Sequence, residues 1–327
     1  MLLKLTSYYK GKRIPELPGN NLFHSRELFL VYEQTPGYQP ILIVGTVDGK
    51  PVVKLLAVIR KNKRLFIPSF IHRCTVYGTG EYLDENINKE EVFGEILEHL
   101  TNEASRKSFL IEFRNLENSL FGYKYFRHNR YFPVNWLRVR NSIHSMASPM
   151  DRINESRRRQ IKKALENGAE VSEANTEEEI TAFSKMLRKN YSSKIRKHFP
   201  DSRFFHLLAE QSKLAQTGKI FIIRYKDKII GGSVCLFSGG DAYLLFSGGM
   251  RKSYKKLYPG VLAVWKVIDY CYHHNIRHLE FMDVGLPFKK HGYREFVLRF
   301  GGKQSSTRRW FRFQWSFFNK ILEKIYV

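Results

Sequence analysis

The order of elements along this chain repeats, and the repeat constrains the fold more than any other feature. A hairpin pattern, an amphipathic helix and a buried strand follow one another in each half of the 327 residues. In the first half these elements are expected at 40–59, at Lys89–Ala104 and at 109–113. In the second half they are expected at 219–237, 259–274 and 278–283. This order predicts an α/β chain built by internal duplication.

Shorter features support the duplication. The first hairpin turns at Asp48-Gly49, which is a strong hairpin signal between two β-branched runs. The string Gly122-Tyr-Lys-Tyr-Phe126 recurs as Gly292-Tyr-Arg-Glu-Phe296. Each half then ends in an aromatic and basic strand, at 136–140 and at 308–315. Chance similarity between two generic α/β segments is the alternative.

We expect two domains, 1–150 and 151–327. The second begins with a helix that carries the basic run Arg157-Arg-Arg-Gln-Ile-Lys-Lys163. No low-complexity linker separates the halves, so we expect them to pack together.

The charge balance indicates an anionic partner. The chain has 55 Lys and Arg against 31 Asp and Glu, a formal net charge of +24. Such a surface attracts polyanions: the phosphates of CoA, a nucleotide sugar, tRNA or anionic lipid headgroups. A basic protein without such a partner is the alternative.

Cysteine spacing and apolar runs narrow the class of protein. The three cysteines form no CxxC pair and no Cys/His ligand spacing, so neither a disulfide framework nor a metal site is expected. The apolar run at the N-terminus is too short for a signal peptide, and no later uncharged run reaches membrane-spanning length. We therefore expect a cytoplasmic protein.

The segment 243–302 holds the candidate site. A strand at 242–249 leads into a basic loop, and a helix then opens with Pro259-Gly260. Because a helix N-terminus presents unpaired amides and the positive end of the dipole, this order suits a bound pyrophosphate. The expected cofactor-binding residues are Gly248, Arg251, Lys252, Lys255, Lys256, Tyr258 and Gly260.

Other phosphate-binding motifs are missing from the sequence. It has neither a Walker lysine motif nor GxGxxG, which argues against a P-loop ATPase and a Rossmann dehydrogenase. Without further support, the basic loop would be interpreted as an ordinary solvated loop.

Several strings resemble a known family when taken in order. Ser156-Arg-Arg-Arg-Gln-Ile-Lys-Lys-Ala-Leu-Glu-Asn-Gly168 looks like the helix that opens the catalytic half of Fem-type proteins. It is followed by Ile229-Ile-Gly-Gly232, Tyr258-Pro-Gly260, Glu280-Phe-Met-Asp-Val-Gly285 and Arg294-Glu-Phe-Val-Leu-Arg-Phe-Gly-Gly302. The chain is similar to the Fem/BioF2-like branch of GNAT acyltransferases, whose members commonly carry two tandem GNAT folds. The resemblance is specific from about Asn154 onward.

The resemblance implies an α/β (α+β) fold of two tandem GNAT-like domains, each a mixed, bent, largely antiparallel sheet flanked by helices. In such a domain two central strands part and admit the pantetheine arm of acyl-CoA (acetyl-CoA), the co-substrate. The resemblance assigns the acyl-donor site to 151–327 and leaves 1–150 as a degenerate domain that binds the acceptor or is structural.

Two positions depart from the family pattern. The loop lacks the Gln/Arg-x-x-Gly-x-Gly/Ala signature of ordinary acetyl-CoA users. Phe296-Val297 stands where Fem aminoacyltransferases usually show Phe-Lys, a lysine associated with a phosphorylated cell-wall substrate.

Acyl transfer to an amine needs a base for the nucleophile and a proton donor for the leaving thiolate. Asp283 and Glu295 are the candidate bases, and Tyr293 is the candidate donor. Backbone amides near the bulged strand would hold the oxyanion. The alternatives are structural: Asp283 caps a loop, Tyr293 packs in a core and Glu295 is a solvated helix residue.

The leading hypothesis is an acyltransferase that moves an acyl group from acyl-CoA to an amine acceptor. The second is a Fem-type aminoacyl-tRNA-dependent transferase acting on a cell-wall or lipid precursor. The third is a non-catalytic basic protein that binds nucleic acid or a membrane. The aromatic and basic tail from Trp310 to Val327 suits either docking at the inner membrane face or packing on the second half.

Overall fold

The chain folds into two compact units that each draw on both halves of the sequence. The computed structural model describes residues 2–61, 72–116, 118–144, 148–192 and 199–326. One unit consists of Met1–Trp136 and Ser306–Val327, and the other of Leu137–Ser305. Residues 137–150 therefore belong with the second unit and 306–327 with the first, whereas the sequence placed a single boundary after residue 150.

The first unit is a mixed sheet with the strand order β1-β2-β3-β4-β6-β13, and β5 pairs with β3 beside it. Its elements are β1 (Lys4–Tyr8), η1 (Gly11–Arg13), η2 (Leu22–His24), α1 (Arg26–Gln34), β2 (Tyr38–Val47), β3 (Lys50–Arg60), β4 (Arg73–Tyr77), β5 (Glu81–Tyr82), α2 (Lys89–Ala104), β6 (Leu110–Arg114), α3 (Tyr123–His128), β13 (Lys303–Phe313) and α11 (Ser316–Tyr326).

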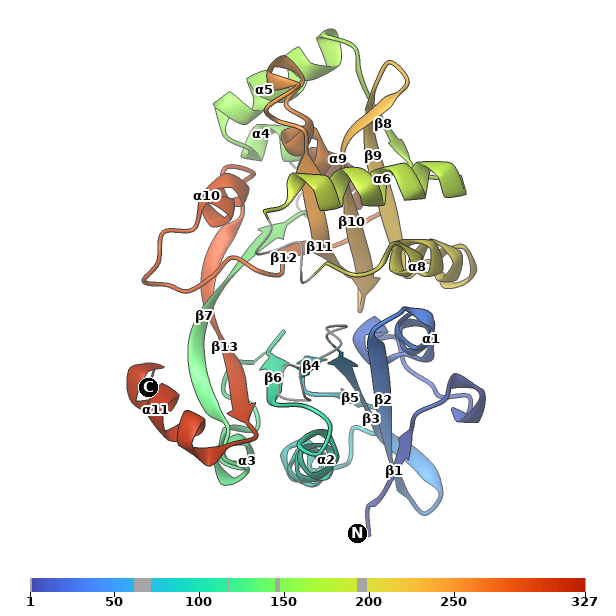
Figure 1. Cartoon of the computed structure of the whole chain (residues 1–327), viewed down its shortest axis with the longest axis vertical. Coiled ribbons are helices and arrows are strands. Elements are labelled where there is room, and N and C mark those ends of the chain that lie inside the picture. The colour runs from blue at the N-terminus through green and yellow to red at the C-terminus, as the bar shows by residue number, and fades with distance from the viewer. Residues whose placement is uncertain (1, 62–71, 117, 145–147, 193–198, 327) are drawn as a thin grey trace, which may run out of the picture. The chain divides into compact units, whose positions relative to one another are not determined.

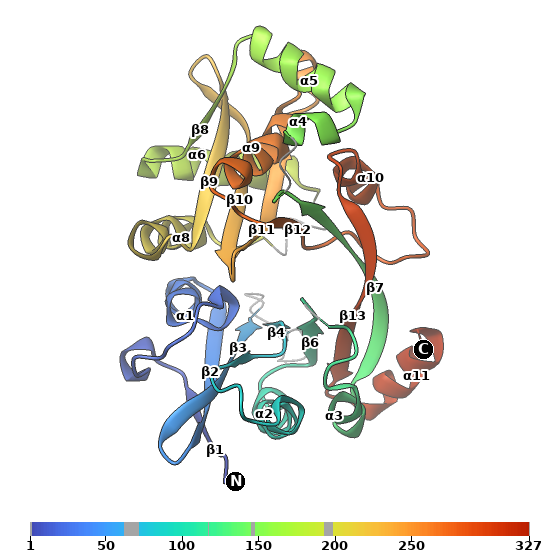
Figure 2. The same ribbon diagram turned by 180° about the vertical axis from the view of Figure 1, so that it is seen from behind.

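The second unit has the strand order β8-β9-β10-β11-β12-β7. Its elements are β7 (Phe132–Ser142), α4 (Pro149–Arg152), α5 (Glu155–Glu166), β8 (Ala169–Glu173), α6 (Glu177–Asn190), α8 (Ser202–Ala215), β9 (Gly218–Tyr225), β10 (Lys228–Ser238), β11 (Asp241–Gly249), η4 (Lys255–Leu257), α9 (Pro259–His273), β12 (His278–Phe281) and α10 (Gly292–Leu298). Helices α6 and α8 cover one face of this sheet and α9 the other, as the two views show (Figure 1, Figure 2).

The two sheets repeat the same pattern of pairing. In each, three antiparallel pairs are followed by one parallel pair, β4 with β6 and β11 with β12, and then by a final antiparallel strand. The helix that crosses between the parallel strands is α2 in one unit and α9 in the other. The expected fold of two related halves, each a largely antiparallel sheet flanked by helices, is confirmed.

The last strand of each half is exchanged, which the sequence analysis did not anticipate. β7 follows α3 in the chain, yet its residues 139–142 pair with β12 of the second unit. β13 follows α10, yet its residues 309–313 pair with β6 of the first unit. The expectation that each half ends in its own strand, with the tail packed on the second half, is therefore wrong. Both strands are aromatic and basic, so composition alone does not indicate which sheet edge each one completes.

A buried glutamate fixes each exchanged strand. Glu112 on β6 is fully buried and pairs with Arg309 of β13 at 3.2 Å, and with Arg73 and Arg114. Glu280 on β12 occupies the corresponding position and pairs with two arginines of β7, Arg138 and Arg140. Each carboxylate therefore pairs with at least one arginine of the incoming strand.

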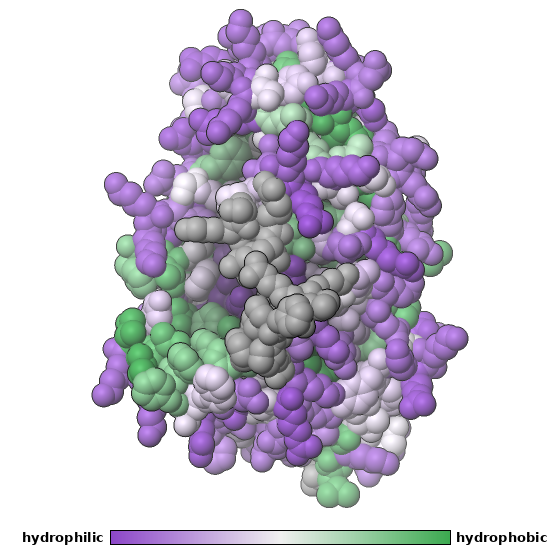
Figure 3. Space-filling model, viewed as in Figure 1, coloured by the Kyte–Doolittle hydropathy of each residue, from purple (hydrophilic) through white to green (hydrophobic). Residues whose placement is uncertain are grey.

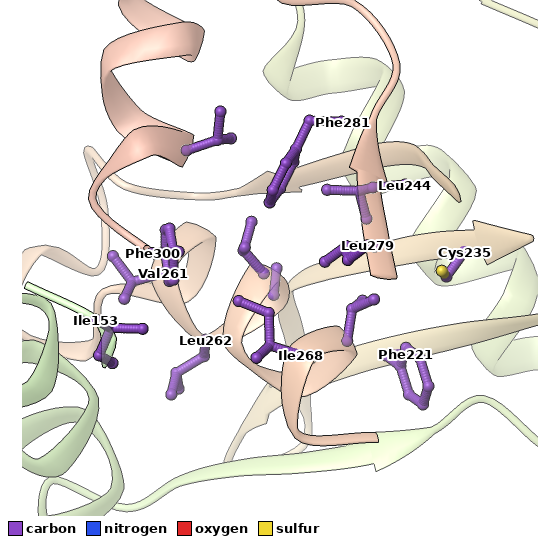
Figure 4. Packing of buried hydrophobic residues seen from close by; sticks show 14 of the residues in the cluster. Ile153, Phe221, Cys235, Leu244, Val261, Leu262, Ile268, Leu279, Phe281 and Phe300 are labelled. Carbon is purple, nitrogen blue, oxygen red and sulfur yellow. The ribbon is translucent and has the colours of Figure 1, made fainter. Parts of the chain in front are cut away.

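The core of the second unit lies between its sheet and α9. Val261, Leu262 and Ile268 of the helix pack with Leu244 of β11 and with the side chains of β12 (Figure 4). This packing fixes α9, and hence its first turn, against the end of β11.

The charge on Glu112 gives an acid-sensitive contribution to stability. Burial by itself would raise the pKa of this carboxyl, but the three guanidinium charges outweigh it and lower the pKa from 4.5 to about 2. A carboxyl whose pKa is lowered on folding stabilises the protein above its unfolded pKa, and this stabilisation is lost as the pH falls through the folded value. For Glu112 that window runs from about pH 4.5 down to about pH 2.

We expect Glu112→Gln to lower the free energy of unfolding at neutral pH by about 3–5 kcal/mol, because it leaves buried guanidinium groups without their carboxylate. The variant should also lose less stability than the wild type between pH 5 and about pH 2.5. Chemical unfolding at neutral pH, at pH 5 and at about pH 2.5 measures these differences in stability. Glu85→Gln, at a side chain that is 84% exposed, is the control and should change little. Equal stabilities of the Glu112 variant and the wild type would contradict the role of Glu112.

Candidate functional site

Strands β11 and β12 pair over only part of their length. Their parallel pairing joins Ala242–Leu244 to Leu279–Phe281, and β11 then continues to Gly249 without a β12 partner. The separation begins at a β-bulge: on β10, Val234 faces Phe246 while Cys235 faces Leu244, so Leu245 is the extra residue. A bulge bends its strand and disrupts the ladder locally. The end of β11 is thereby left with backbone groups that β12 does not use.

The first unit lacks this separation. There β4 pairs with β6 at every position from Arg73 to Tyr77, and no register shift interrupts its pairing with β3. The two units thus share a topology but differ at the point where the resemblance places the acyl donor.

The start of α9 lies directly against the end of β11. Gly249 permits this approach, because a Cβ there would lie 2.6 Å from the Gly260 amide nitrogen and 2.8 Å from the Pro259 carbonyl carbon. At Gly260, by contrast, a Cβ would meet nothing within 4 Å, so space is open beside the first turn. Tyr258 adopts the left-handed conformation (φ 42°) that turns the chain into the helix.

The first turn of α9 is suited to an anion. It contains no acidic residue, and no side chain caps it. The corresponding helix of the first unit, α2, is capped by Asn88 and carries Glu90 and Glu91 in its first turn. Carboxylates there satisfy the positive end of the helix dipole and repel phosphate, whereas at α9 the dipole is unopposed.

The basic loop before α9 supplies exposed positive charge. Arg251, Lys252, Lys255 and Lys256 are all exposed, and the last two lie in η4. The side-chain amide of Asn167, at the end of α5, donates to the carbonyl of Lys256 at 3.1 Å and so anchors the loop. Gly248 lies further back, where a Cβ would meet Leu187 of α6 at 2.8 Å.

A buried arginine adds to this charge. Arg157 of α5 is 93% buried, with its guanidinium 4.5 Å from the centre of the Phe296 ring and 5.4 Å from that of Phe300. Its Nη1 donates to Gln160 and its Nε has no hydrogen-bond partner. Among the residues that the structure describes, no carboxylate pairs with it. Burial and the charges of Arg299 and Arg251 lower the pKa of this guanidinium.

A cluster of hydroxyl groups lies where the strands part. Tyr191, at the end of α6, donates to the backbone carbonyl of Ser247 on β11 at 2.8 Å. The Tyr293 hydroxyl, from α10, hydrogen-bonds with the Ser247 side chain and lies within reach of the charge of Asp283. Burial raises the pKa of Tyr293 well above its usual value near 10; the hydrogen bond opposes this rise, and Tyr191 and Asp283 add to it.

Two of the three candidate catalytic residues, Asp283 and Tyr293, interact electrostatically. Asp283 follows β12 as an exposed carboxylate near Tyr293. Glu295 is exposed in the first turn of α10, and no described contact joins it to the other two. Arg294 of the same helix donates to the carbonyls of Val284, Leu286 and Lys289, which holds the segment after Asp283 in place.

Four contributors to this site were missed from the sequence: Arg157, Tyr191, Ser247 and Gly249. Arg157 lies in a basic run in which no residue stands out, and Tyr191 comes from a helix far from the loop. The only available signal was at Gly249, the last residue of a strand that ends in Gly-Gly.

The described parts of the chain offer no residues for two other kinds of site. No three His, Cys, Asp or Glu side chains are grouped to hold a metal ion there. No described helix combines the length and apolar character needed to cross a membrane.

Gly249 at the end of β11 and Gly260 at the start of α9 allow a matched test. Gly249→Ala places a methyl group against the Gly260 and Pro259 backbone and should lower the free energy of unfolding by about 1–3 kcal/mol. Gly260→Ala adds the same atom in open space and should leave stability unchanged within about 0.5 kcal/mol. Denaturant titration of both variants compares them. If Gly249→Ala lowers the free energy of unfolding less than Gly260→Ala does, the close packing of β11 against the helix start is contradicted.

Comparisons with known proteins agree with this geometry. Residues 154–290 match the family model described as an acetyltransferase (GNAT) domain. The fold is similar to that of FemX (TM-score 0.63, 11% identity, 94% of this chain and 95% of that one). It is also similar to a tandem GNAT protein from the clavulanic acid biosynthesis pathway (TM-score 0.60, 9% identity, 96% and 99%) and to L-PGS from Bacillus licheniformis (TM-score 0.57, 10% identity, 94% and 93%). No curated protein sequence matches the chain.

The family match covers the parted strands, the basic loop and the start of α9. It supports acyl transfer as the general chemistry of the second unit. At these low identities the similar structures establish the fold alone. Residues 154–290 therefore match the GNAT acetyltransferase family model, and the whole chain has a fold similar to those of FemX and the tandem GNAT protein.

Proposed function

We propose that this protein is an acyl-CoA-dependent N-acyltransferase whose donor site lies in the second unit. The observation that carries the proposal is the combination of parted strands and an uncapped, acid-free helix start at the same end of β11. The parted strands provide free backbone groups beside a thioester. The helix start provides amides and positive charge for the phosphates of CoA.

The residues present fit acyl-CoA. The open space beside Gly260 leaves room for a phosphate at the first turn of α9. Arg251, Lys252, Lys255 and Lys256 would add charge-assisted hydrogen bonds. Arg157 contributes a buried positive charge near Arg251 that no described carboxylate neutralises. When bound, acyl-CoA supplies the activated acyl group.

Asp283 and Tyr293 would carry the proton transfers. As the amine attacks the thioester carbonyl, the Asp283 carboxylate accepts the proton that the amine loses. Unpaired backbone amides at the end of β11 would hold the oxyanion. Tyr293 is protonated at neutral pH, as any tyrosine is, and its raised pKa adds to this, so it would donate to the departing thiolate and not act as a base. The proton that Asp283 takes from the amine would then restore the Tyr293 hydroxyl. Glu295 lacks a described contact with this pair and is the least supported of the three candidate catalytic residues.

The first unit would bind the acceptor or serve a structural role. Its central strands pair along the full length of β4, and the first turn of α2 is acidic. Both features oppose a second acyl-CoA site. We also propose a cytoplasmic location, in which acyl-CoA is available.

A second candidate function is aminoacyl transfer from tRNA to a cell-wall or lipid precursor. The similarity to the fold of FemX and the net charge of +24 favour it. Phe296-Val297 opposes it, because the lysine expected for a phosphorylated cell-wall substrate is missing. A basic protein without catalytic activity is the third candidate. Titration with acetyl-CoA, charged tRNA and bare RNA separates the three.

We expect Lys255→Ala/Lys256→Ala to weaken CoA binding about tenfold at low salt, with a smaller difference at high salt because exposed charges are screened. Isothermal titration at two salt concentrations measures this. Lys162→Ala/Lys163→Ala removes the same charge from exposed positions of α5 and is the control. Equal weakening by both pairs would mean that only overall charge matters, and unchanged affinity would remove the loop from the donor site.

Tyr293→Phe should fold normally and lose about 100-fold in turnover, because it retains the ring and removes the donor hydroxyl. Asp283→Asn should lose turnover to a similar degree without weakening CoA binding. Thiol release with a panel of amines, combined with CoA titration, distinguishes chemistry from binding. Glu295→Gln is the comparison and should remain active. Full activity of both the Tyr293 and Asp283 variants would dismiss the proposed chemistry.

A further inference from the structure

The C-terminal helix α11 presents an apolar stripe to solvent. Phe317, Ile321 and Ile325 recur every four residues and therefore share one face of the helix. Their side chains are 65%, 40% and 64% exposed, and Trp315, just before the helix, is 54% exposed. None of the described residues of α11 is buried. The hydrophobic surface is visible where α11 lies in the same view (Figure 3).

Contacts on the opposite face of α11 hold the stripe outward. Asn319 both donates to the carbonyl of Phe313 (2.9 Å) and accepts from its amide (2.7 Å). Phe318 packs edge-on against Phe109, with ring centres 5.6 Å apart. Glu323 pairs with Arg127 of α3. Rotating the helix to bury Phe317 and Ile325 would break these contacts, so the exposed stripe is a fixed feature of the first unit.

Two lysines border one edge of the apolar stripe. Lys320 and Lys324 are both exposed and lie one position before Ile321 and Ile325. The chain as a whole carries a net charge of +24. Apolar and aromatic side chains bordered by lysines are the composition of helices that lie in the interface of a bilayer with anionic lipids. A tryptophan at the edge of such a stripe suits the headgroup level.

We propose that α11 docks the protein on an anionic membrane surface, with Trp315, Phe317, Ile321 and Ile325 inserted among the lipids and the two lysines at the headgroups. An RNA partner would use the lysines and leave Phe317 and Ile325 in water, so it fits the surface less well. The proposal goes beyond the acyltransferase function and does not depend on it.

Flotation of the full-length protein with phosphatidylglycerol/phosphatidylcholine vesicles tests the proposal. The wild type should float with these vesicles and much less with pure phosphatidylcholine. Phe317→Ser/Ile321→Ser/Ile325→Ser should weaken binding at least about 100-fold, because three inserted side chains are lost. Lys320→Gln/Lys324→Gln should weaken binding to the anionic vesicles about 25-fold, or about fivefold per lysine. Trp315 fluorescence should shift to the blue on binding, and Trp315→Phe should remove that shift.

The control is Leu214→Ser on α8, at a side chain that is 79% exposed but lies outside the stripe, which should bind as the wild type does. Thermal unfolding checks that every variant is folded. Failure of the folded wild type to bind anionic vesicles overturns the proposal, as does undiminished binding by the triple serine variant. A dimer in sedimentation velocity that the triple variant converts to a monomer also overturns it, since the stripe would then face a second copy.

Discussion

Each sheet of this protein is completed by a strand from the other half of the chain, and the pairing depends on a buried carboxylate. Glu112 and Glu280 occupy corresponding positions on β6 and β12; Glu112 binds one arginine of its exchanged strand and Glu280 binds two. A buried ion pair contributes little net stability compared with apolar packing, but an unpaired buried carboxylate costs several kcal/mol. A β7 without suitably placed arginines would remove both arginine partners of Glu280, whereas Glu112 would lose Arg309 but keep Arg73 and Arg114. The two glutamates therefore contribute to holding each exchanged strand at its sheet edge.

The candidate site depends on a difference between two units of the same topology. One extra residue, Leu245, interrupts β11 just after its last pairing with β12. The counterpart β4 has no such interruption and pairs along its length. The helix starts also differ. Asn88 caps α2, which carries Glu90 and Glu91 in its first turn, whereas α9 begins with Pro259-Gly260 and has neither a side-chain cap nor an acidic residue there. Two units of the same topology thus differ at this point: one has parted strands and an acid-free helix start, and the other has fully paired strands and an acidic helix start.

Local patterns were sufficient to predict most elements. Asp48-Gly49 adopts positive φ values of 49° and 77° at the hairpin turn, as the dipeptide predicts. The expected helix at Lys89–Ala104 is observed over those residues, and the one at 259–274 ends one residue earlier. These elements were predictable because turn chemistry and apolar periodicity act over a few neighbouring residues. The strand exchange was not, because either strand carries a suitable pattern and the choice depends on partners more than 130 residues away.

The sequence by itself determined the repeated order of elements, the basic loop and the helix start at Pro259-Gly260, because each of these depends only on residues that are neighbours in the chain. Only the tertiary structure decided that Tyr293 meets Ser247, and that Arg157 is buried beside Phe296 without a described carboxylate. The tertiary structure also decided that the apolar residues of α11 face outward, since that orientation is set by Asn319 and Glu323 bonding to Phe313 and Arg127. Apart from the bonds of Asn319 to the nearby Phe313 backbone, these relations join side chains distant in sequence, and such contacts follow from packing, which no local pattern encodes.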